Sequence, residues 1–392
     1  MDVGALKARM LATVDELAPL LLETSHQIHA NPELNFEERF ASGLLADVLE
    51  QQGVEVTRGA FDLETAFDAT VGSEGPMIAV CLEYDALPVV GHACGHNVIA
   101  AAGLGAGLAA AALAEEAGGR VRILGTPAEE GGGGKVLMAD RGALEGVDAA
   151  MMVHPADADL LAMDAIAATH LEVVYEGVAA HAAAFPHLGR NALDAAVLGY
   201  VNIAALRQHI EATDRVHGVF LEGGDKANIV PERTRMQWMV RSARFASLEP
   251  LQKRVEACFD AGAAATGCSC SYGVTNPPYA DMIDNPVLVG LYAANSEALG
   301  RPLADPRAGG PRVVGSTDMG NVSYLVPAIH PMVKVAPKGV SIHTHEFTEH
   351  ARSEAGDAAV LHGARTMAAT VADLWADRSL VAQARSAFDA TV

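Results

Sequence analysis

Apolar residues in the first part of the chain follow two different spacings. Residues 3–22 and 37–52 carry them three and four positions apart, which predicts amphipathic helices. Short apolar runs at 77–82, 121–125 and 149–153 are ended by turn or polar residues and predict buried strands. Helices that alternate with buried strands are typical of a parallel sheet with helices on both faces. We therefore predict an α/β fold whose main domain contains a doubly wound, mostly parallel sheet.

From about residue 168 the pattern is that of a separate unit. Segments typical of strand, helix, strand, strand, helix and strand follow one another at 169–175, 191–209, 216–221, 235–240, 248–265 and 269–274. This order predicts a small α+β, ferredoxin-like fold. The earlier alternation then resumes, with helices predicted at 286–299 and 353–376. We therefore predict a discontinuous main domain at 1–167 and 278–392, and an inserted lid domain at 168–277.

Composition and charge exclude several classes of protein. The 392 residues include 27 Lys and Arg against 49 Asp and Glu, a formal net charge of −22. Such a charge repels nucleic acids over most approaches, so we expect no nucleic acid partner. Half of the residues are hydrophobic and 19% are charged, a balance unlike that of a disordered chain.

Three features bear on the location of the protein. The uncharged stretch at 98–114 is nearly all Ala and Gly, which favours a buried helix over a membrane span. Residues 1–23 lack the layout of a secretory signal. Five cysteines in so long a chain do not make a disulfide framework, which fits a reducing compartment. We expect a cytoplasmic protein with no membrane partner.

Polar side chains directly follow the predicted strands of the main sheet. Glu83 and Asp85 follow the first run, Glu129 and Glu130 the second, and His154 the third. Parallel α/β sheets bind ligands at the carboxyl ends of their strands, so we expect these groups to converge in one crevice. An adjacent Glu pair there lets one carboxylate bind metal while its neighbour handles protons. Taken alone, however, a Glu pair is more often a solvated surface feature.

A metal site is also indicated by the segment Gly-His-Ala-Cys-Gly-His-Asn at 91–97. It places His92, Cys94 and His96 within five residues, on a glycine-flexed loop before a helix. Nitrogen and sulfur ligands of this kind suit borderline-soft cations such as zinc. A glycine-rich turn with incidental histidines would explain one His, whereas three potential ligands together favour metal. His343 and His345 add two imidazoles near the far end of the chain.

Seven short motifs occur in an order that is informative as a set. They are Asn31-Pro-Glu-Leu34, Tyr84-Asp-Ala-Leu-Pro88, His92-Ala-Cys-Gly-His96, Pro127-Ala-Glu-Glu130, Ala180-His-Ala-Ala183, Asn191-Ala-Leu193 and His343-Thr-His-Glu-Phe347. Over nearly the whole chain they resemble the aminoacylase and carboxypeptidase-G type family of di-metal peptidases and amidohydrolases. That family includes hippurate, indole-acetyl-amino-acid and p-aminobenzoyl-glutamate hydrolases.

Three further motifs indicate a branch of this family. They are Glu83-Tyr-Asp-Ala-Leu-Pro88, Glu129-Glu-Gly-Gly-Gly-Gly-Lys135 and Ser316-Thr-Asp-Met-Gly320. They resemble the branch that contains p-aminobenzoyl-glutamate hydrolase subunits and dipeptidases acting on basic C-terminal residues.

The resemblance implies a metal-dependent amidohydrolase or dipeptidase with two divalent ions, zinc or manganese, with cobalt as a further candidate. Carried over residue by residue, the implied metal ligands are Cys94, His96, Glu130, His154 and His343. Glu129 would be the general base, activating a water that bridges the ions to attack the amide of an N-acyl or N-aminoacyl amino acid. Asp85 resembles an Asp that orients a metal ligand from behind, and a turn-forming Asp explains it nearly as well.

The chain departs from the family pattern at two positions. The metallopeptidase branch has a His where this chain has Glu83, whereas the amidohydrolase branch uses the Cys of the loop, here Cys94. Glu83 is therefore either an additional ligand or a neighbour of the ligands. His345 stands where the related pattern often has Pro, and we assign the ligand to His343 by its register with the Glu-Phe pair.

The inserted domain contains three further candidates. His181 resembles a His that in relatives reaches the active site of the partner subunit and stabilises the oxyanion, which implies a homodimer. A surface His in an Ala-rich turn is the alternative. Asn228 and Arg241 resemble residues that bind the substrate carboxylate. For Arg241 a surface ion pair is an equally good explanation.

Two other functions stay open from the residues alone. A thiol hydrolase would use Cys94 as nucleophile and His96 or His92 as base, and would need no metal. A catalytically silent binding protein would keep the fold and the metal. The presence of Glu129 argues against the silent protein.

Overall fold

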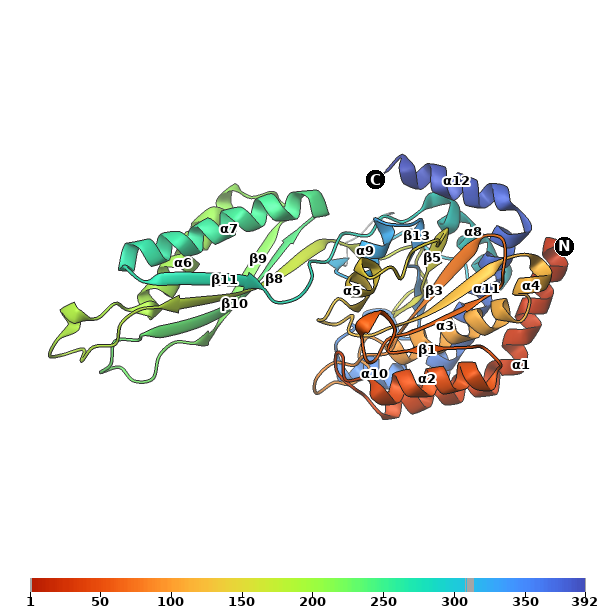
Figure 1. Ribbon diagram of the computed structural model, residues 1–392, viewed down its shortest axis with the longest axis horizontal. Helices are drawn as coiled ribbons and strands as arrows, with labels where there is room; N and C mark the ends of the chain where they lie inside the picture. Colours follow the sequence, from red (N-terminus) through yellow and green to blue (C-terminus); the bar gives the residue numbers. More distant parts are fainter. Residues whose placement is uncertain (1, 307, 309–313, 392) are drawn as a thin grey trace. The chain divides into compact units, whose positions relative to one another are not determined.

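The computed structural model describes residues 2–306, 308 and 314–391. The chain divides into two compact units, Met1–Asp164 with Met282–Val392, and Ala165–Asp281. The larger unit is therefore discontinuous in sequence, and the smaller one is inserted between its two segments (Figure 1).

The larger unit contains a six-stranded sheet. In spatial order its strands are β1 (Thr57–Arg58), β2 (Phe67–Val71), β4 (Arg120–Thr126), β3 (Met77–Glu83), β5 (Ala149–Met151) and β13 (Ala328–Ile329). β4, β3, β5 and β13 are parallel, whereas β1 and β2 run antiparallel at one edge. Every residue of β3 is buried, as expected for a central strand covered on both faces. The prediction of an α/β fold with a mainly parallel sheet is confirmed.

Helices surround this sheet. They are α1 (Val3–Ala30), α2 (Arg39–Gln51), α3 (His96–Ala111), α4 (Ala114–Ala117), α5 (Gly134–Asp140), α8 (Pro286–Ala298), α9 (Met319–Ser323), α10 (His345–His350), α11 (Glu354–Ala376) and α12 (Arg378–Asp389). α1, α3 and α11 pack against one another, and α3 also packs on β3 and β4. The remaining short elements of the chain are β6 (His154–Ala156), β7 (Asp164–Ala165), β12 (Val314–Gly315), β14 (Met332–Lys334) and the 3-10 turns Ala60–Asp62, Pro186–Leu188 and Arg207–His209.

The two faces of β3 are covered by different helices. Gly103 of α3 lies against Leu82, and a Cβ at that glycine would be 2.9 Å from the Leu82 side chain. Cys81 points to the opposite face, because side chains alternate along a strand. There it lies with Met138 of α5 at a small cavity. The parallel strands are therefore sandwiched between helices.

Helix α3 covers most of the stretch at 98–114, and its residues from His96 to Ala110 are all buried. Among the described residues, no helix combines the length and the hydrophobicity that a membrane-spanning segment requires.

Two predicted elements differ from the structure. α1 continues to Ala30 instead of ending near residue 22, because Thr24, Ser25 and Ile28 keep one side of its last turns buried. The predicted strand at 149–153 ends at Met151, and a separate strand, β6, begins at His154 and pairs in parallel with β14.

The smaller unit is built in the order strand, helix, strand, strand, helix, strand. Its elements are β8 (Ala167–Glu176), α6 (Ala192–Leu206), β9 (Arg215–Glu222), β10 (Arg233–Ser242), α7 (Phe245–Thr266) and β11 (Ser269–Val274). The sheet order is β11-β8-β10-β9, with antiparallel neighbours throughout. α6 and α7 pack together over a core that includes Trp238 and Phe259. This unit therefore has a core of its own.

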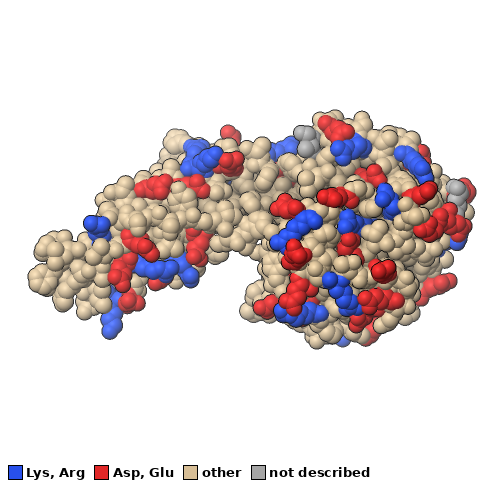
Figure 2. All heavy atoms as spheres, viewed as in Figure 1, with Lys and Arg blue, Asp and Glu red and all other residues tan. Residues whose placement is uncertain are grey.

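Acidic and basic side chains are mixed on the face drawn in Figure 2. Arg39 pairs with Glu64, and Arg58 pairs with Asp47, in exposed ion pairs of the larger unit. On this face acidic side chains lie on both units.

Candidate metal centre and active site

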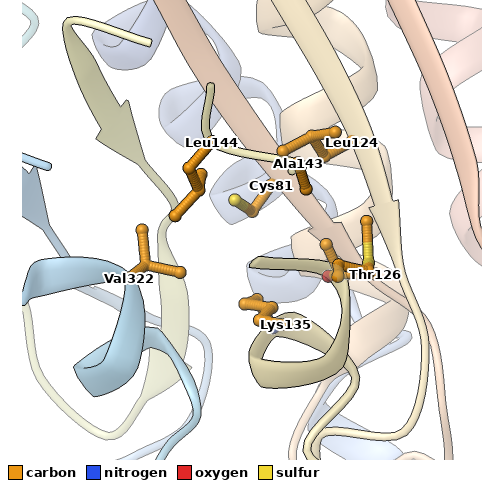
Figure 3. A pocket seen from close by; sticks show the side chains of 8 residues that line it. Cys81, Leu124, Thr126, Lys135, Ala143, Leu144 and Val322 are labelled. Atoms are coloured by element: carbon orange, nitrogen blue, oxygen red, sulfur yellow. The ribbon is translucent and has the colours of Figure 1, made fainter. Parts of the chain in front are cut away.

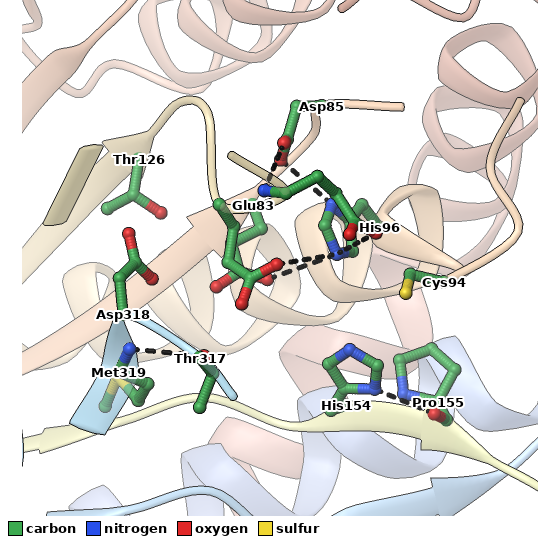
Figure 4. A network of polar contacts seen from close by, with 12 residues as sticks. Glu83, Asp85, Cys94, His96, Thr126, His154, Pro155, Thr317, Asp318 and Met319 are labelled. Carbon is green, nitrogen blue, oxygen red and sulfur yellow. Dashed lines mark hydrogen bonds and ion pairs between the residues drawn. The ribbon is translucent and has the colours of Figure 1, made fainter. Parts of the chain in front are cut away.

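Separate segments of the larger unit bring polar side chains to one place (Figure 4). Glu83 is the last residue of β3, and His96 is the first residue of α3. Glu129 and Glu130 follow the end of β4, and His154 begins β6. Glu130 is half-buried and the other four are buried. The carboxyl ends of the parallel strands therefore meet at a buried polar cluster.

Asp85 orients two members of this cluster. Its Oδ1 lies 2.9 Å from Nδ1 of His96, and its Oδ2 accepts a hydrogen bond of 2.9 Å from the backbone N–H of Glu130. Burial alone would raise the pKa of Asp85, but the His96 imidazole and the hydrogen bonds hold it below its ordinary value. Burial alone would lower the pKa of His96, but Asp85, Glu83 and Glu130 raise it well above its ordinary value. If a metal ion displaced the proton at Nε2, the remaining ring proton would face Asp85.

His154 and His343 approach the same place from other segments. Nδ1 of His154 lies 2.8 Å from the Pro155 carbonyl oxygen, and its Nε2 has no hydrogen bond to another of the described residues. Nε2 of His343 lies 3.0 Å from Sγ of Cys94 and 3.5 Å from Oε2 of Glu130. His343 has φ = 66°, an unusual value for a residue other than glycine. Strained backbone of this kind is concentrated at functional sites.

Potential metal ligands form compact groups here. One group is Cys94, His96 and His154, and a second is Cys94, Glu130 and His343. Within each group the ligand atoms lie within 4.8 Å of one another. The structure thus brings together all five side chains that the resemblance implies as ligands, with Cys94 common to both groups. A third group contains Glu83, His96 and Glu129.

Distances in the cluster fit a cation better than hydrogen bonds. Nε2 of His96 lies 3.5 Å from Oε2 of Glu83 and 3.9 Å from Oε1 of Glu130. Within the described chain, these three buried atoms have no hydrogen-bond partner. An N–H···O hydrogen bond spans about 2.7–3.2 Å, whereas two ligands that each lie about 2.1 Å from one tetrahedral ion are roughly 3.4 Å apart. The donor set therefore fits divalent metal.

The charge of the cluster leads to the same conclusion. Its carboxylates are Glu83, Asp85, Glu129, Glu130 and Asp318. Lys135 is the ammonium group that pairs with two of them. Among the described residues of the cluster, five carboxylates against one ammonium leave four negative charges when all are ionised, and a metal-bound Cys94 thiolate would add a fifth. Such an excess of negative charge favours divalent cations. Burial raises the pKa of both Glu129 and Glu130, and the nearby carboxylates raise that of Glu129 further.

Lys135 and Asp318 are site residues that the sequence analysis did not assign. Nζ of Lys135 pairs with Oε1 of Glu83 and lies 2.8 Å from Oδ1 of Asp318. Burial alone would lower the pKa of Lys135, but Asp318 and Glu83 raise it above its ordinary value. Both residues stand in motifs noticed in the sequence, at 129–135 and 316–320, but a single Lys or Asp carries no signal of its partner.

His330 was also missed. Its ring packs edge-on against His154, with 5.4 Å between ring centroids. The imidazole is wholly buried, and neither of its nitrogen atoms has a hydrogen-bond partner among the described residues. One more histidine in the sequence, without a neighbouring motif, gave no reason to select it.

The remaining candidates lie elsewhere. His345 is exposed at the start of α10 and belongs to none of the ligand groups found among the described residues. His181, Asn228 and Arg241 belong to the smaller unit. Nδ1 of His181 accepts hydrogen bonds of 3.2 Å from the backbone N–H groups of the two residues after Ala182. The roles of these three residues stay predictions.

The comparisons with known proteins agree with this chemistry. The family model "Peptidase family M20/M25/M40" matches residues 83–373. The Xaa-Arg dipeptidase of Mus musculus is 38% identical over 403 aligned residues, which cover 99% of this chain and 93% of that protein. One of the subunits of the p-aminobenzoyl-glutamate hydrolase of Escherichia coli is 28% identical, with 92% of this chain and 90% of that protein covered.

Solved structures show the same fold. An aminobenzoyl-glutamate utilization protein from Klebsiella pneumoniae has a TM-score of 0.75 at 19% identity, with 92% of this chain and 98% of that chain covered. The Bacillus subtilis YXEP protein, a dinuclear metal binding peptidase from the M20 family, has a TM-score of 0.68 at 18% identity, with 92% and 99% covered. The family model, the extended similarity to the dipeptidase and the strand ends that carry the Cys, His and Glu cluster together place this chain in Peptidase family M20/M25/M40.

Proposed function

We propose that the protein is a metal-dependent hydrolase that cleaves the amide bond of an N-acyl or N-aminoacyl amino acid. The observation that carries the proposal is the group of Cys94, His96, Glu130, His154 and His343, of which Cys94, His96 and His154 are buried, with Glu129 beside it. Membership of a peptidase family supports amide hydrolysis. The relatives named Xaa-Arg dipeptidase and p-aminobenzoyl-glutamate hydrolase support a dipeptide-like or aminobenzoyl-glutamate-like substrate.

Two divalent ions, zinc or manganese with cobalt as a further candidate, would be held by the two ligand groups that share Cys94. When bound, they would polarise the amide carbonyl and make a water molecule at the site more acidic. Asp85 supports this arrangement, because its carboxylate contacts Nδ1 of His96 and accepts a hydrogen bond from the backbone N–H of Glu130.

Glu129 is the proposed general base. Oε2 of Glu129 lies 4.0 Å from Nε2 of His96, so the carboxylate borders the ligand group. Burial, Glu83 and Glu130 raise the pKa of Glu129. A carboxylate with a raised pKa can take a proton from the attacking water and return it to the leaving amine.

The structure weakens the alternative of a thiol hydrolase. Burial, followed by Glu130, raises the pKa of Cys94 well above its ordinary value, whereas a nucleophilic cysteine needs a lowered pKa. Nε2 of His92 lies 3.1 Å from the Ile28 carbonyl oxygen, and burial lowers the pKa of His92 to about 3. A catalytically silent binding protein remains the second alternative.

Amine release from N-acetyl, N-benzoyl, N-aminobenzoyl and dipeptide substrates tests the proposal. Chelated protein should be inactive and should recover with zinc, manganese or cobalt. Glu129→Gln should lower kcat by about 10²- to 10⁴-fold with unchanged metal content, whereas the exposed Glu64→Gln should have no effect. Activity that survives chelation and is lost on alkylation would instead support the thiol hydrolase. No turnover of any substrate with metal bound would support the binding protein.

We also propose that the chain acts as a homodimer, with residues of the smaller unit forming a lid. β9 is an edge strand whose Val219, Phe220 and Leu221 are exposed, and α6 exposes Val197 and Val201. Unpaired edges and contiguous exposed apolar side chains are typical of surfaces that a partner covers. In this proposed dimer His181 of one chain would complete the site of the other, as its resemblance to the partner-reaching His of relatives implies.

Mixing two inactive variants tests this arrangement. His181→Ala and Glu129→Gln should each be inactive alone. Refolded together, they should recover about a quarter of wild-type activity, because half of the dimers are mixed and each mixed dimer has one complete site. A monomeric mass in solution, or no recovery in the mixture, would contradict the proposal.

Asn228 and Arg241 are the proposed ligands of the substrate carboxylate. Arg241 is partly buried, and burial lowers its pKa while its guanidinium stays charged. Arg241→Lys should raise KM with little change in kcat, because a single ammonium cannot replace the two hydrogen bonds of a bidentate guanidinium.

The five cysteines form no disulfide, which supports a reducing location such as the cytoplasm.

A further inference from the structure

Glu83 presents two oxygen atoms with different surroundings. Its Oε1 pairs with Nζ of Lys135. Its Oε2 is buried, has no hydrogen-bond partner in the described chain, and lies 3.5 Å from Nε2 of His96. A buried carboxylate oxygen without a partner is costly, so its surroundings need an explanation.

Direct contact between Glu83 and His96 does not provide that explanation. Nε2 of His96 and Oε2 of Glu83 lie 3.5 Å apart, which is beyond hydrogen-bond distance, and neither atom has another hydrogen-bond partner among the described residues. Two ligand atoms that each lie about 2.1 Å from one tetrahedral ion would have about this separation. The separation of 3.5 Å equals that between Nε2 of His343 and Oε2 of Glu130, a pair of proposed ligands.

Lys135 is held so that it can fix the orientation of Glu83. It lies in the first turn of α5, and its backbone N–H donates to Oδ2 of Asp318 at 2.9 Å. Its Nζ lies 2.8 Å from the other oxygen of the same carboxylate. Asp318 thus contacts both the backbone N–H and the ammonium of Lys135, and the same ammonium contacts Oε1 of Glu83. All three side chains are buried.

The space around Lys135 does not offer a separate ligand site. The cavity that Lys135 lines with Cys81, Leu124 and Val322 has a volume of about 10 Å³ (Figure 3). A water molecule needs roughly 10–15 Å³, so at most one water fits. The ammonium therefore acts on the side chains around it, and through Glu83 it reaches the metal cluster.

We propose that Glu83 is an additional protein ligand of the metal ion bound by His96, through Oε2, and that Lys135 and Asp318 are positioning residues that hold it there. This inference rests on the proposed metal-dependent function. Its consequence is a harder ligand set at that ion than Cys94, His96 and His154 alone would supply, since a carboxylate oxygen favours harder cations such as manganese.

Metal titration of the chelated protein tests the role of Glu83 without relying on turnover. Zinc and manganese are titrated into wild type and Glu83→Gln in the presence of a competing chromophoric chelator. Glu83→Gln should weaken one of the two ions by at least about tenfold, with the larger loss for manganese. Glu83→His, which restores a ligand atom, should recover zinc affinity. Equal affinities in wild type and Glu83→Gln would overturn the proposal.

A cobalt spectrum gives a second readout. Loss of one ligand should change the visible absorption of the cobalt-substituted protein in Glu83→Gln, whereas a purely structural role for Glu83 leaves the spectrum as in wild type. Asp68→Asn is the matched control, because it breaks an ion pair with Arg122 on neighbouring strands. It should lower stability without changing the spectrum or metal affinity.

Lys135→Met and the double variant with Glu83→Gln test the positioning role. Lys135→Met should weaken the same ion, and it should cause no further loss of metal affinity when Glu83 is already Gln. A further loss in the double variant would show that Lys135 does not act through Glu83. Wild type that binds both ions but hydrolyses no substrate would refute the proposed function alone. Wild type that binds no ion would refute both proposals.

Discussion

Glu38 Oε1 accepts a hydrogen bond of 2.9 Å from the backbone N–H of Ala128, the residue directly before Glu129. Ala128 has φ = 59°, in the left-handed region that residues other than glycine rarely adopt. Glu38 is wholly buried, and its other oxygen accepts a hydrogen bond of 2.8 Å from the Thr65 hydroxyl. A carboxylate from the start of α2 therefore holds the strained peptide from which the proposed base projects.

Replacing Glu38 by Gln should loosen this peptide. The amide has one oxygen where the carboxylate has two, so one of the N–H or O–H donors around Glu38 loses its acceptor. The free energy of unfolding should fall by about 1–3 kcal/mol, and kcat should fall more than KM rises, because Glu129 is displaced while the rest of the site is intact. Urea unfolding and steady-state kinetics measure both. Glu64→Gln, at an exposed glutamate, serves as control. An unchanged kcat in Glu38→Gln would contradict the positioning role.

Glu38 should also make stability depend on pH. Burial, followed by repulsion from Asp85, raises its pKa from 4.5 to about 7. The folded protein then binds this proton more tightly than the unfolded chain, so the contribution of Glu38 to stability falls as pH rises from about 4.5 to about 7. Glu38→Gln lacks the titrating group. The stability of wild type relative to Glu38→Gln should therefore be greater at pH 5 than at pH 8, and equal differences at both would refute the assigned pKa.

Val89 should be a site of stabilising substitution. It has φ = 71° at the tip of a tight turn closed by hydrogen bonds between Leu87 and Gly91. The residue is 92% exposed, so removal of its side chain loses almost no packing. Val89→Gly should raise the free energy of unfolding by about 1 kcal/mol, the relief of strain being partly offset by the freedom gained in the unfolded chain. Thermal unfolding checks this, and a lower Tm for Val89→Gly than for wild type would show that the valine side chain stabilises the folded protein.

Gly134 should tolerate no side chain. A Cβ there would lie 1.8 Å from the Pro127 carbonyl oxygen, a backbone atom that cannot move without shifting the loop that carries Glu129. Gly134→Ala should therefore destabilise the protein by about 1–3 kcal/mol. It should also lower activity, because the loop that carries Glu129 would shift. Gly43, inside α2, has no atom within 4 Å of a built Cβ. Gly43→Ala should instead stabilise by about 0.5–1 kcal/mol, and similar effects of both substitutions would contradict the steric argument.

Elements with a strong local pattern could be predicted from the sequence. The apolar run at 77–82 corresponds to β3, because a strand buried on both faces is apolar at consecutive positions. The helix predicted at 353–376 corresponds to α11, whose first turn is capped by Ser353. The strand predicted at 149–153 was too long, because β6 is defined by pairing with β14, far along the chain.

The donors available to the candidate site can be read from the amino-acid sequence: a Cys and a His in one loop, two adjacent Glu residues after a strand, and further histidines. How these donors meet depends on the folded chain. His343 contacts Cys94 across 249 positions, and Lys135 reaches Asp318 across 183. The physical reason is that a buried charge is stable only where the folded chain supplies its counter-charge, and that requirement leaves no periodic trace in the sequence. Which oxygen of Glu83 faces Lys135 and which faces His96 is therefore a property of the fold.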